Sequence, residues 1–332
     1  MPFGSTFIFF AVLEVIKGAA KALYSGSFEA LTYDSLKDNG KEDLYPTISA
    51  NLVTVSWIGY ILAGVLGGIL YDIWFGLPYL VLALLYFIII ILFIVYAKEP
   101  SVDSVKVTVK NYLKQNIEGF NELFSKFNVS IVTIILAIIT IGYYTASELL
   151  GISQGNQYGL SGTQVGLIFT CGYIVSVGLS YVFPLFLKKF KTLSIVVSAT
   201  SALLISFLLA KFVSPVIGAS LIVLRISNSS TFSNIRSIIL NKNISSKNRS
   251  TALSSFALIY ELGYVAIAYF AGKYIGNNSP NDFAFLLGII LLGLLVFLLV
   301  IYLFFRKKKL RRQAIKTNPF LCFQFIRVLL LS

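Results

Sequence analysis

The chain has 332 residues, of which 57% are hydrophobic and 12% charged, and its mean hydropathy is +0.84. Because a soluble domain is roughly one quarter charged, this composition excludes water as the only solvent of the folded chain. The chain contains no histidine and only two cysteines, Cys171 and Cys322, so a disulfide framework, a metal site and histidine-based catalysis all lack their residues.

The net charge of +13 comes from lysines and arginines that stand between long hydrophobic runs. A nucleic-acid-binding protein would instead gather its basic residues on one face of a folded domain. The charge therefore indicates a lipid bilayer as the partner and no nucleic acid. We also expect no enzyme activity, no cofactor and no metal.

Nine hydrophobic runs reach the length of a membrane-spanning helix, which is about 20 mostly apolar residues for a hydrocarbon core of about 30 Å. They lie at residues 6–24, 47–71, 78–97, 130–150, 164–186, 193–212, 214–239, 251–274 and 284–305. The last run contains no charged residue, whereas the first contains Glu14, Lys17 and Lys21. The sequence therefore predicts an all-α integral membrane protein with nine transmembrane helices.

Positive residues are distributed unevenly between the two ends of these spans. If alternate loops are assigned to opposite sides, 22 of the 27 basic residues fall on one side, and Arg236 is among them. Only Lys211 and Lys273 fall in loops on the other side. Since positive loops remain in the cytoplasm, the carboxyl terminus is predicted to be cytoplasmic and the amino terminus of this chain extracytoplasmic.

Two hydrophilic segments divide the predicted spans. Residues 98–129 form a cytoplasmic central loop in which apolar residues recur at helical spacing among lysines, as in an amphipathic helix on the membrane surface. These apolar residues are Val109, Leu113, Ile117, Phe120, Phe124 and Phe127. The predicted division is a partial bundle of three helices at 1–97, this loop, a six-helix bundle at 130–305 and a basic cytoplasmic tail at 306–332.

The segment LEVIKGAAKALYSGSFEALTYDSLKDNGKEDLY holds the most specific motif of the chain. A glutamate and small residues lead into S-G, then E-A-L, then Y-D-S-L. This order resembles the fourth helix and following loop in a bacterial subgroup of the major facilitator superfamily, whose full bundle has 6+6 helices. The matching residues are Glu14, Gly18, Ser25, Gly26, Glu29, Ala30, Tyr33, Asp34 and Leu36. The resemblance implies a permease, with Glu29, Tyr33 and Asp34 in a cytoplasmic loop motif.

Small residues recur along the second span, at Gly59, Ala63, Gly64, Gly67 and Gly68. They resemble the glycine-rich fifth-helix motif of drug and proton antiporters, whose core reads G-P-x-x-G-G, although Ala63-Gly64 stands in place of G-P. Small residues at this spacing also permit close helix packing on any interpretation. The glycines therefore favour both a packing role and, more weakly, antiport.

The resemblance extends to about residue 305 and includes Glu99-Pro100, Asn241 and Arg249, the last of which belongs to the cytoplasmic loop motif. Nothing in the chain corresponds to helices one to three of the family, or to the loop motif between helices two and three. We therefore expect a chain truncated at its amino terminus that transports poorly by itself. An inactive remnant and one fragment of a split transporter are the alternatives.

The ionisable candidates within the predicted spans are Glu14, Lys17, Lys21, Glu148, Arg225 and Glu261. A charge at the bilayer centre costs about 2.5–3.5 kcal/mol on insertion scales, so such residues are candidates for substrate binding or ion coupling. The family's cavity is lined by helices one, four, seven and ten. The resemblance therefore implies that Glu14, Lys17, Glu148 and Arg225 face the cavity.

Structural alternatives remain open for each of these charges. Glu14 and Lys17 are three residues apart and could neutralise each other, and Glu148 could lie in the outer headgroup zone. Arg225 precedes four polar residues and could serve helix-to-helix hydrogen bonding instead of the cavity. Glu261 could couple a proton or pair with Arg225. The resulting hypothesis is a secondary transporter of a small organic solute that works by alternating access, with protons as a candidate coupling ion.

Overall fold

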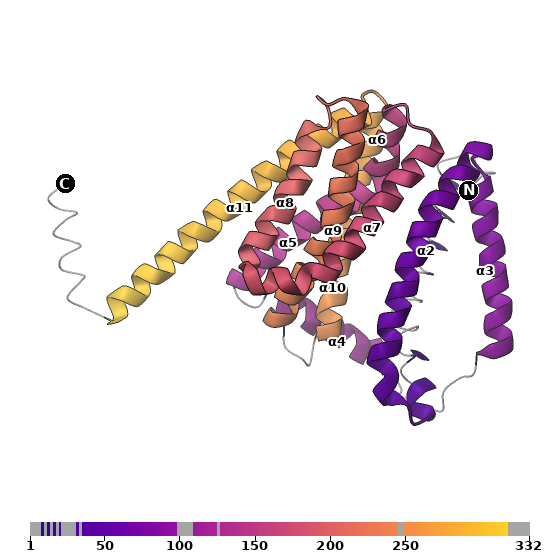
Figure 1. Ribbon diagram of the computed structural model, residues 1–332. Helices are drawn as coiled ribbons and strands as arrows, with labels where there is room; N and C mark the ends of the chain where they lie inside the picture. Colours follow the sequence, from indigo (N-terminus) through magenta and orange to yellow (C-terminus); the bar gives the residue numbers. More distant parts are fainter. Residues whose placement is uncertain are drawn as a thin grey trace. The chain divides into compact units, whose positions relative to one another are not determined.

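The computed structural model describes residues 35–97, 109–124, 127–244 and 249–317, together with residues 31–32 and isolated positions before residue 21. All regular structure in these residues is helical (Figure 1). The elements are η1 (Glu42–Leu44), α2 (Tyr45–Ile73), α3 (Leu77–Tyr96), α4 (Val109–Leu123), α5 (Phe127–Thr145), the π-helical turn η2 (Ala146–Leu150), α6 (Gly151–Gln157), α7 (Gly162–Lys189), α8 (Thr192–Leu209), α9 (Pro215–Asn243), α10 (Arg249–Ile275) and α11 (Pro280–Thr317).

Seven helical stretches of the described chain are long and apolar enough to cross a membrane. They are Thr54–Ile73, Leu77–Tyr96, Val129–Gln157, Gly162–Lys189, Thr192–Leu209, Thr251–Ile275 and Pro280–Phe305. Each coincides with one of the nine predicted spans. The prediction of an all-helical, multi-pass membrane protein is therefore confirmed.

The other two predicted spans differ from these seven for separate reasons. Helix α9 occupies the predicted span at 214–239, but its run of serine, asparagine and arginine residues lowers its hydropathy below that of the seven. The first span, at 6–24, lies largely outside the described residues, and every described position between 8 and 20 is helical.

The helices group into two compact units that are not contiguous in sequence. Unit 1 combines Met1–Thr108, Ile152–Pro184 and Ser214–Ser230, and unit 2 holds the remainder. Unit 1 therefore contains most of α7 and the first half of α9 together with the amino-terminal helices. The predicted division into two bundles and a central loop stays a prediction.

Helix α3 of unit 1 has no buried side chain among its 20 residues, all of which are uncharged and mostly aliphatic or aromatic. In water such a surface would drive aggregation, whereas a bilayer accepts it without penalty. Its length of 20 residues matches the hydrocarbon thickness, since a helix rises about 1.5 Å per residue. Helix α3 is thus a lipid-facing span.

The core of unit 2 is formed by α5, α8 and α11, which pack around small residues. A Cβ atom on Gly142 of α5 would lie 2.9 Å from a methyl carbon of Leu203 and 3.3 Å from one of Leu291. Both leucines are buried. Close packing of small residues is the usual way in which helices associate in lipid, because the hydrophobic effect does not drive helices together in an apolar solvent.

Helix α4 lies in the predicted central loop and packs against the beginning of α10. A Cβ atom on Gly119 would lie 2.8 Å from the backbone nitrogen of Ala252, so the glycine permits this contact. Leu123 on the same helix is fully buried, whereas Ile117 and Phe120 are exposed. The helix is therefore amphipathic, with one face on α10 and an apolar edge left for the membrane surface.

Candidate functional site

Helices α2 and α7 approach each other through glycines on both sides. A Cβ atom on Gly64 would lie 3.1 Å from the carbonyl oxygen of Gly166, and one on Gly162 would lie 3.1 Å from that of Gly68. Each helix thus presents a G-x-x-x-G pattern, and the backbones approach closely at these positions because the glycines have no side chains. We call these four residues, Gly64, Gly68, Gly162 and Gly166, the glycine seam.

The glycine seam is closed at one end by Asp72. Its Oδ1 accepts a hydrogen bond from the N–H of Gly162 and its Oδ2 one from the N–H of Thr163, both at 2.7 Å. These N–H groups belong to the first turn of α7, where the helix leaves them without internal partners and carries a partial positive charge. A carboxylate at the end of α2 therefore caps α7, and the signal for it in the sequence was an acid that ends an apolar run.

The remaining predicted glycines of α2 lie apart from this seam. In the described part of the chain, no atom lies within 4 Å of a Cβ built on Gly59 or Gly67. Beyond the end of the seam opposite Asp72, Thr170 donates a hydrogen bond from its hydroxyl to the carbonyl oxygen of Ile61 at 3.1 Å. The packing role thus falls on the half of the predicted motif that faces α7.

Arg225 is 2% exposed and lies within unit 1, on α9. Its Nη2 donates a hydrogen bond to Oε1 of Gln154 on α6, at 2.9 Å. This arrangement is a helix-to-helix contact, one of the two roles that the sequence left open. The cavity role of Arg225 and its pairing with Glu261 stay predictions.

The polar side chains that follow Arg225 form hydrogen bonds with backbone carbonyl oxygens of their own helix. Ser227, Ser229 and Ser230 each donate a hydroxyl to a carbonyl oxygen three residues earlier in α9, at 2.6–3.0 Å. The amide nitrogen of Asn228 donates to the carbonyl oxygen of Leu224 at 2.9 Å. Such back-bonding lets polar side chains enter a membrane helix at small cost.

Other predicted residues are placed singly. Glu148 lies on the π-helical turn η2 with an exposed side chain, and Glu261 is half-buried on α10. Lys17 occupies an exposed helical position, and Arg249 begins α10. Outside the described residues lie Glu14, Lys21, Glu29, Tyr33 and Asp34. Their predicted roles in binding, coupling and the loop motif stay predictions.

Arg236 requires a correction, because the charge count assigned it to a cytoplasmic loop. It lies inside α9, seven residues before the helix ends at Asn243, and is half-buried. Its guanidinium lies 5.7 Å from the ring centre of Phe256 and 5.8 Å from that of Tyr260. Its position within the predicted span at 214–239 already indicated that it belongs to the helix and not to the loop that follows.

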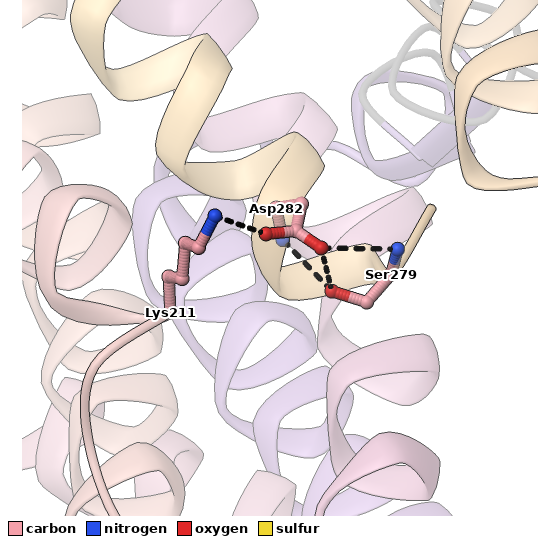
Figure 2. Close-up of polar contacts among 3 residues, drawn as sticks. All are labelled: Lys211, Ser279 and Asp282. Carbon is pink, nitrogen blue, oxygen red and sulfur yellow. Dashed lines mark hydrogen bonds and ion pairs between the residues drawn. The ribbon is translucent and has the colours of Figure 1, made fainter. Parts of the chain in front are cut away.

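A second unpredicted polar group joins the beginning of α11 to the segment after α8 (Figure 2). Lys211 Nζ lies 2.8 Å from Oδ1 of Asp282, and Oδ2 of Asp282 accepts the hydroxyl hydrogen of Ser279 at 2.7 Å. The N–H of Asp282 donates back to the Ser279 hydroxyl, which makes a reciprocal cap of α11. The hydrogen bond and charge of Asp282 raise the pKa of Lys211.

A cavity of about 560 Å³ lies between the end of α10 and the beginning of α11. Its lining is mainly apolar and includes Phe270 and Ile290, which are 65% and 49% exposed. Both side chains are largely exposed, so the cavity is open to the surroundings of the helices. It is distinct from the positions that the sequence predicted for a substrate.

The seven membrane-spanning stretches, the glycine seam and the buried polar contacts between helices define a polytopic membrane protein built as a helix bundle. Residues 1–243 match the model of the Major Facilitator Superfamily, and the chain belongs to that family. Its proteins are membrane carriers of small solutes and not enzymes. Comparison with curated protein sequences finds no match.

Proposed function

We propose that this chain moves a small organic solute across the cell membrane by alternating access. In that mechanism two groups of helices rock about a site near the middle of the membrane and expose it to each side in turn. Membership of the Major Facilitator Superfamily supports the general function. The bacterial subgroup that the resemblance implies is part of this proposal.

The observation that carries the proposal is the glycine seam. Its four glycines have no side chains, which lets the backbones of α2 and α7 approach closely. A contact of this kind can open and close as rigid surfaces without any rotamer having to change. The two hydrogen bonds that Asp72 accepts from the first turn of α7 stabilise the arrangement in which α2 and α7 are in contact.

The orientation of the chain follows from the positive-inside rule and is part of the proposal. The carboxyl terminus is cytoplasmic, so Asp72 and Gly162 lie at the extracytoplasmic end of their helices. In this orientation the glycine seam controls access from outside.

The direction of transport and the residues of the solute path are also part of the proposal. Glycine-rich α2 favours efflux, and Glu14 and Glu261 are the acids available for proton coupling. Lys17, Glu148 and Arg225 are proposed to face the solute path.

A reversible cross-link across the seam tests this proposal. Tyr71→Cys and Thr163→Cys would be combined in a chain with Cys171→Ser and Cys322→Ser, and reconstituted in liposomes with labelled benzoate, ethidium or glucose under a pH gradient. Oxidation should stop movement of the transported probe and reduction should restore it. Each single-cysteine chain serves as the control. Movement that continues at full rate in the cross-linked chain would contradict the proposal.

A further inference from the structure

We propose that Arg236 binds the negatively charged group of the transported solute, which makes the substrate a small organic anion with an apolar or aromatic body. This inference rests on the proposed transport function and gives it a substrate class. It depends on three features of Arg236 within unit 2, which are its hydrogen-bond partners, the aromatic rings around it and its exposure.

The polar partners of Arg236 leave its charge unneutralised. Nη1 donates to the hydroxyl oxygen of Thr140 and Nη2 to that of Ser233, both at 3.2 Å. Both partners are neutral, and two of the five N–H donors of a guanidinium are thereby used. In the part of the chain that the structure describes, no carboxylate forms an ion pair with Arg236. A permanent positive charge with donors to spare therefore stands inside a predicted span.

Aromatic rings surround this charge on the side of α10 and α5. The guanidinium lies close to the rings of Phe256 and Tyr260, and Tyr260 makes an edge contact with Tyr144, at 5.5 Å between ring centres. Tyr144 in turn meets Tyr264 edge-on at 4.9 Å. Tyr144, Tyr260 and Tyr264 are only half-buried. Their exposed faces offer an apolar surface directly beside the guanidinium, which suits a ligand whose ring or chain adjoins a carboxylate.

Two other basic residues show what a structural role looks like in this protein. Arg225 is 2% exposed and donates to Gln154, and Lys211 is paired with Asp282. Arg236 shares neither arrangement, because it is half-buried and keeps donors available. A guanidinium that remains partly open within a membrane helix is suited to take its counter-charge from a bound carboxylate, sulfonate or phosphate.

Binding of matched probes to the purified full chain in detergent tests the assignment. Benzoate and benzylamine share a ring and differ in charge, and thermal stabilisation would be titrated with each. Benzoate should stabilise the protein and benzylamine should not. Arg236→Gln should weaken benzoate binding by at least about tenfold, the range expected for one charge-assisted hydrogen bond. Lys273→Gln, which removes one positive charge from α10 elsewhere, should leave it unchanged.

Arg236→Lys provides a second variant if the glutamine variant does not fold. It keeps the charge but loses the planar fork, so benzoate binding should fall by roughly threefold to tenfold. Equal stabilisation by benzylamine, or benzoate binding that Arg236→Gln and Arg236→Lys both leave intact, would overturn the assignment.

Transport by the same probes in liposomes separates this inference from the function on which it rests. If benzoate binds in an Arg236-dependent way but no probe crosses the membrane, the anion site stands and the transport proposal fails. If a probe is transported at a rate that depends neither on its charge nor on Arg236, transport stands and the anion site fails.

Discussion

The glycine seam of unit 1 and the cluster around Arg236 in unit 2 hold membrane helices together in opposite ways. In the glycine seam, the four glycines have no side chains and backbone meets backbone between α2 and α7. Around Arg236, a cation and large aromatic rings fill the space between α5, α9 and α10. A contact without side chains tolerates almost no addition, whereas a contact made of side chains tolerates exchange but not deletion.

The largest expected effect comes from adding bulk to the glycine seam. Gly166→Leu would place a branched side chain against the backbone of Gly64 and should lower the free energy of unfolding by about 3 kcal/mol, the upper range for overpacking. Unfolding in mixed micelles measures this. Gly67→Leu, on α2 but with no described atom within 4 Å of its Cβ, should change stability by less than about 0.5 kcal/mol. Equal losses in the two variants would show that the seam is not the packing contact.

Deletion in the aromatic cluster should have the next largest effect. Phe256 is 2% exposed, and Phe256→Ala should lower the free energy of unfolding by about 2 kcal/mol through the cavity that it leaves. The loss is smaller than in a soluble core because lipid is itself apolar and the transfer contribution is small. Phe256→Leu keeps most of the volume and should lose less than half as much. A leucine variant as unstable as the alanine variant would argue that ring stacking, not volume, holds this cluster.

A smaller loss is expected when the cap of α7 is neutralised. Asp72→Asn keeps the size of the side chain but removes the charge that faces the first turn of α7 and one acceptor oxygen. The melting temperature should fall by less than in Gly166→Leu and by more than in Gly67→Leu. If Asp72→Asn had the same melting temperature as the unsubstituted protein, the charge of Asp72 would not contribute to the stability of the glycine seam.

The smallest effect is expected at the exposed pair of Lys211 and Asp282. Lys211→Gln removes an ion pair whose lysine side chain is 47% exposed, and surface pairs contribute little because water and salt screen them. The melting temperature should fall slightly at low ionic strength and not at all in about 1 M salt, where the screening length is about 3 Å. A loss that persists in high salt would show that the reciprocal cap with Ser279 depends on the lysine.

Length, hydropathy and residue size were enough to predict seven membrane-spanning helices and half of the glycine seam. The run at 284–305 is apolar throughout, and its helix could be placed without knowledge of its neighbours. Gly64 and Gly68 were recognised from their spacing on α2. Their partners Gly162 and Gly166 were not, because which helix faces α2 is a property of tertiary packing that no local pattern encodes.

The arginines illustrate the same limit at the level of single side chains. Arg225 and Arg236 both lie on α9 among serines and asparagines, and sequence spacing alone does not distinguish them. One meets Gln154 of α6 and the other meets rings of α10. Eleven residues, about three helical turns, separate them, so they lie on nearly the same side of α9 and differ in which helix passes that side at each level. Hydropathy also underestimates how well α9 suits a membrane. Its serine hydroxyls donate to carbonyl oxygens of the same helix, so burying them in lipid costs less free energy than burying unbonded hydroxyls.

Helix α11 runs without interruption for 38 residues, from Pro280 to Thr317 (Figure 1). At about 1.5 Å per residue it is about 57 Å long, nearly twice the thickness of a hydrocarbon core of about 30 Å. A straight rod of that length converts each degree of tilt into about 1 Å of displacement at its far end. Small movements at the Asp282 cap would thus be mechanically amplified at the basic segment that ends the helix.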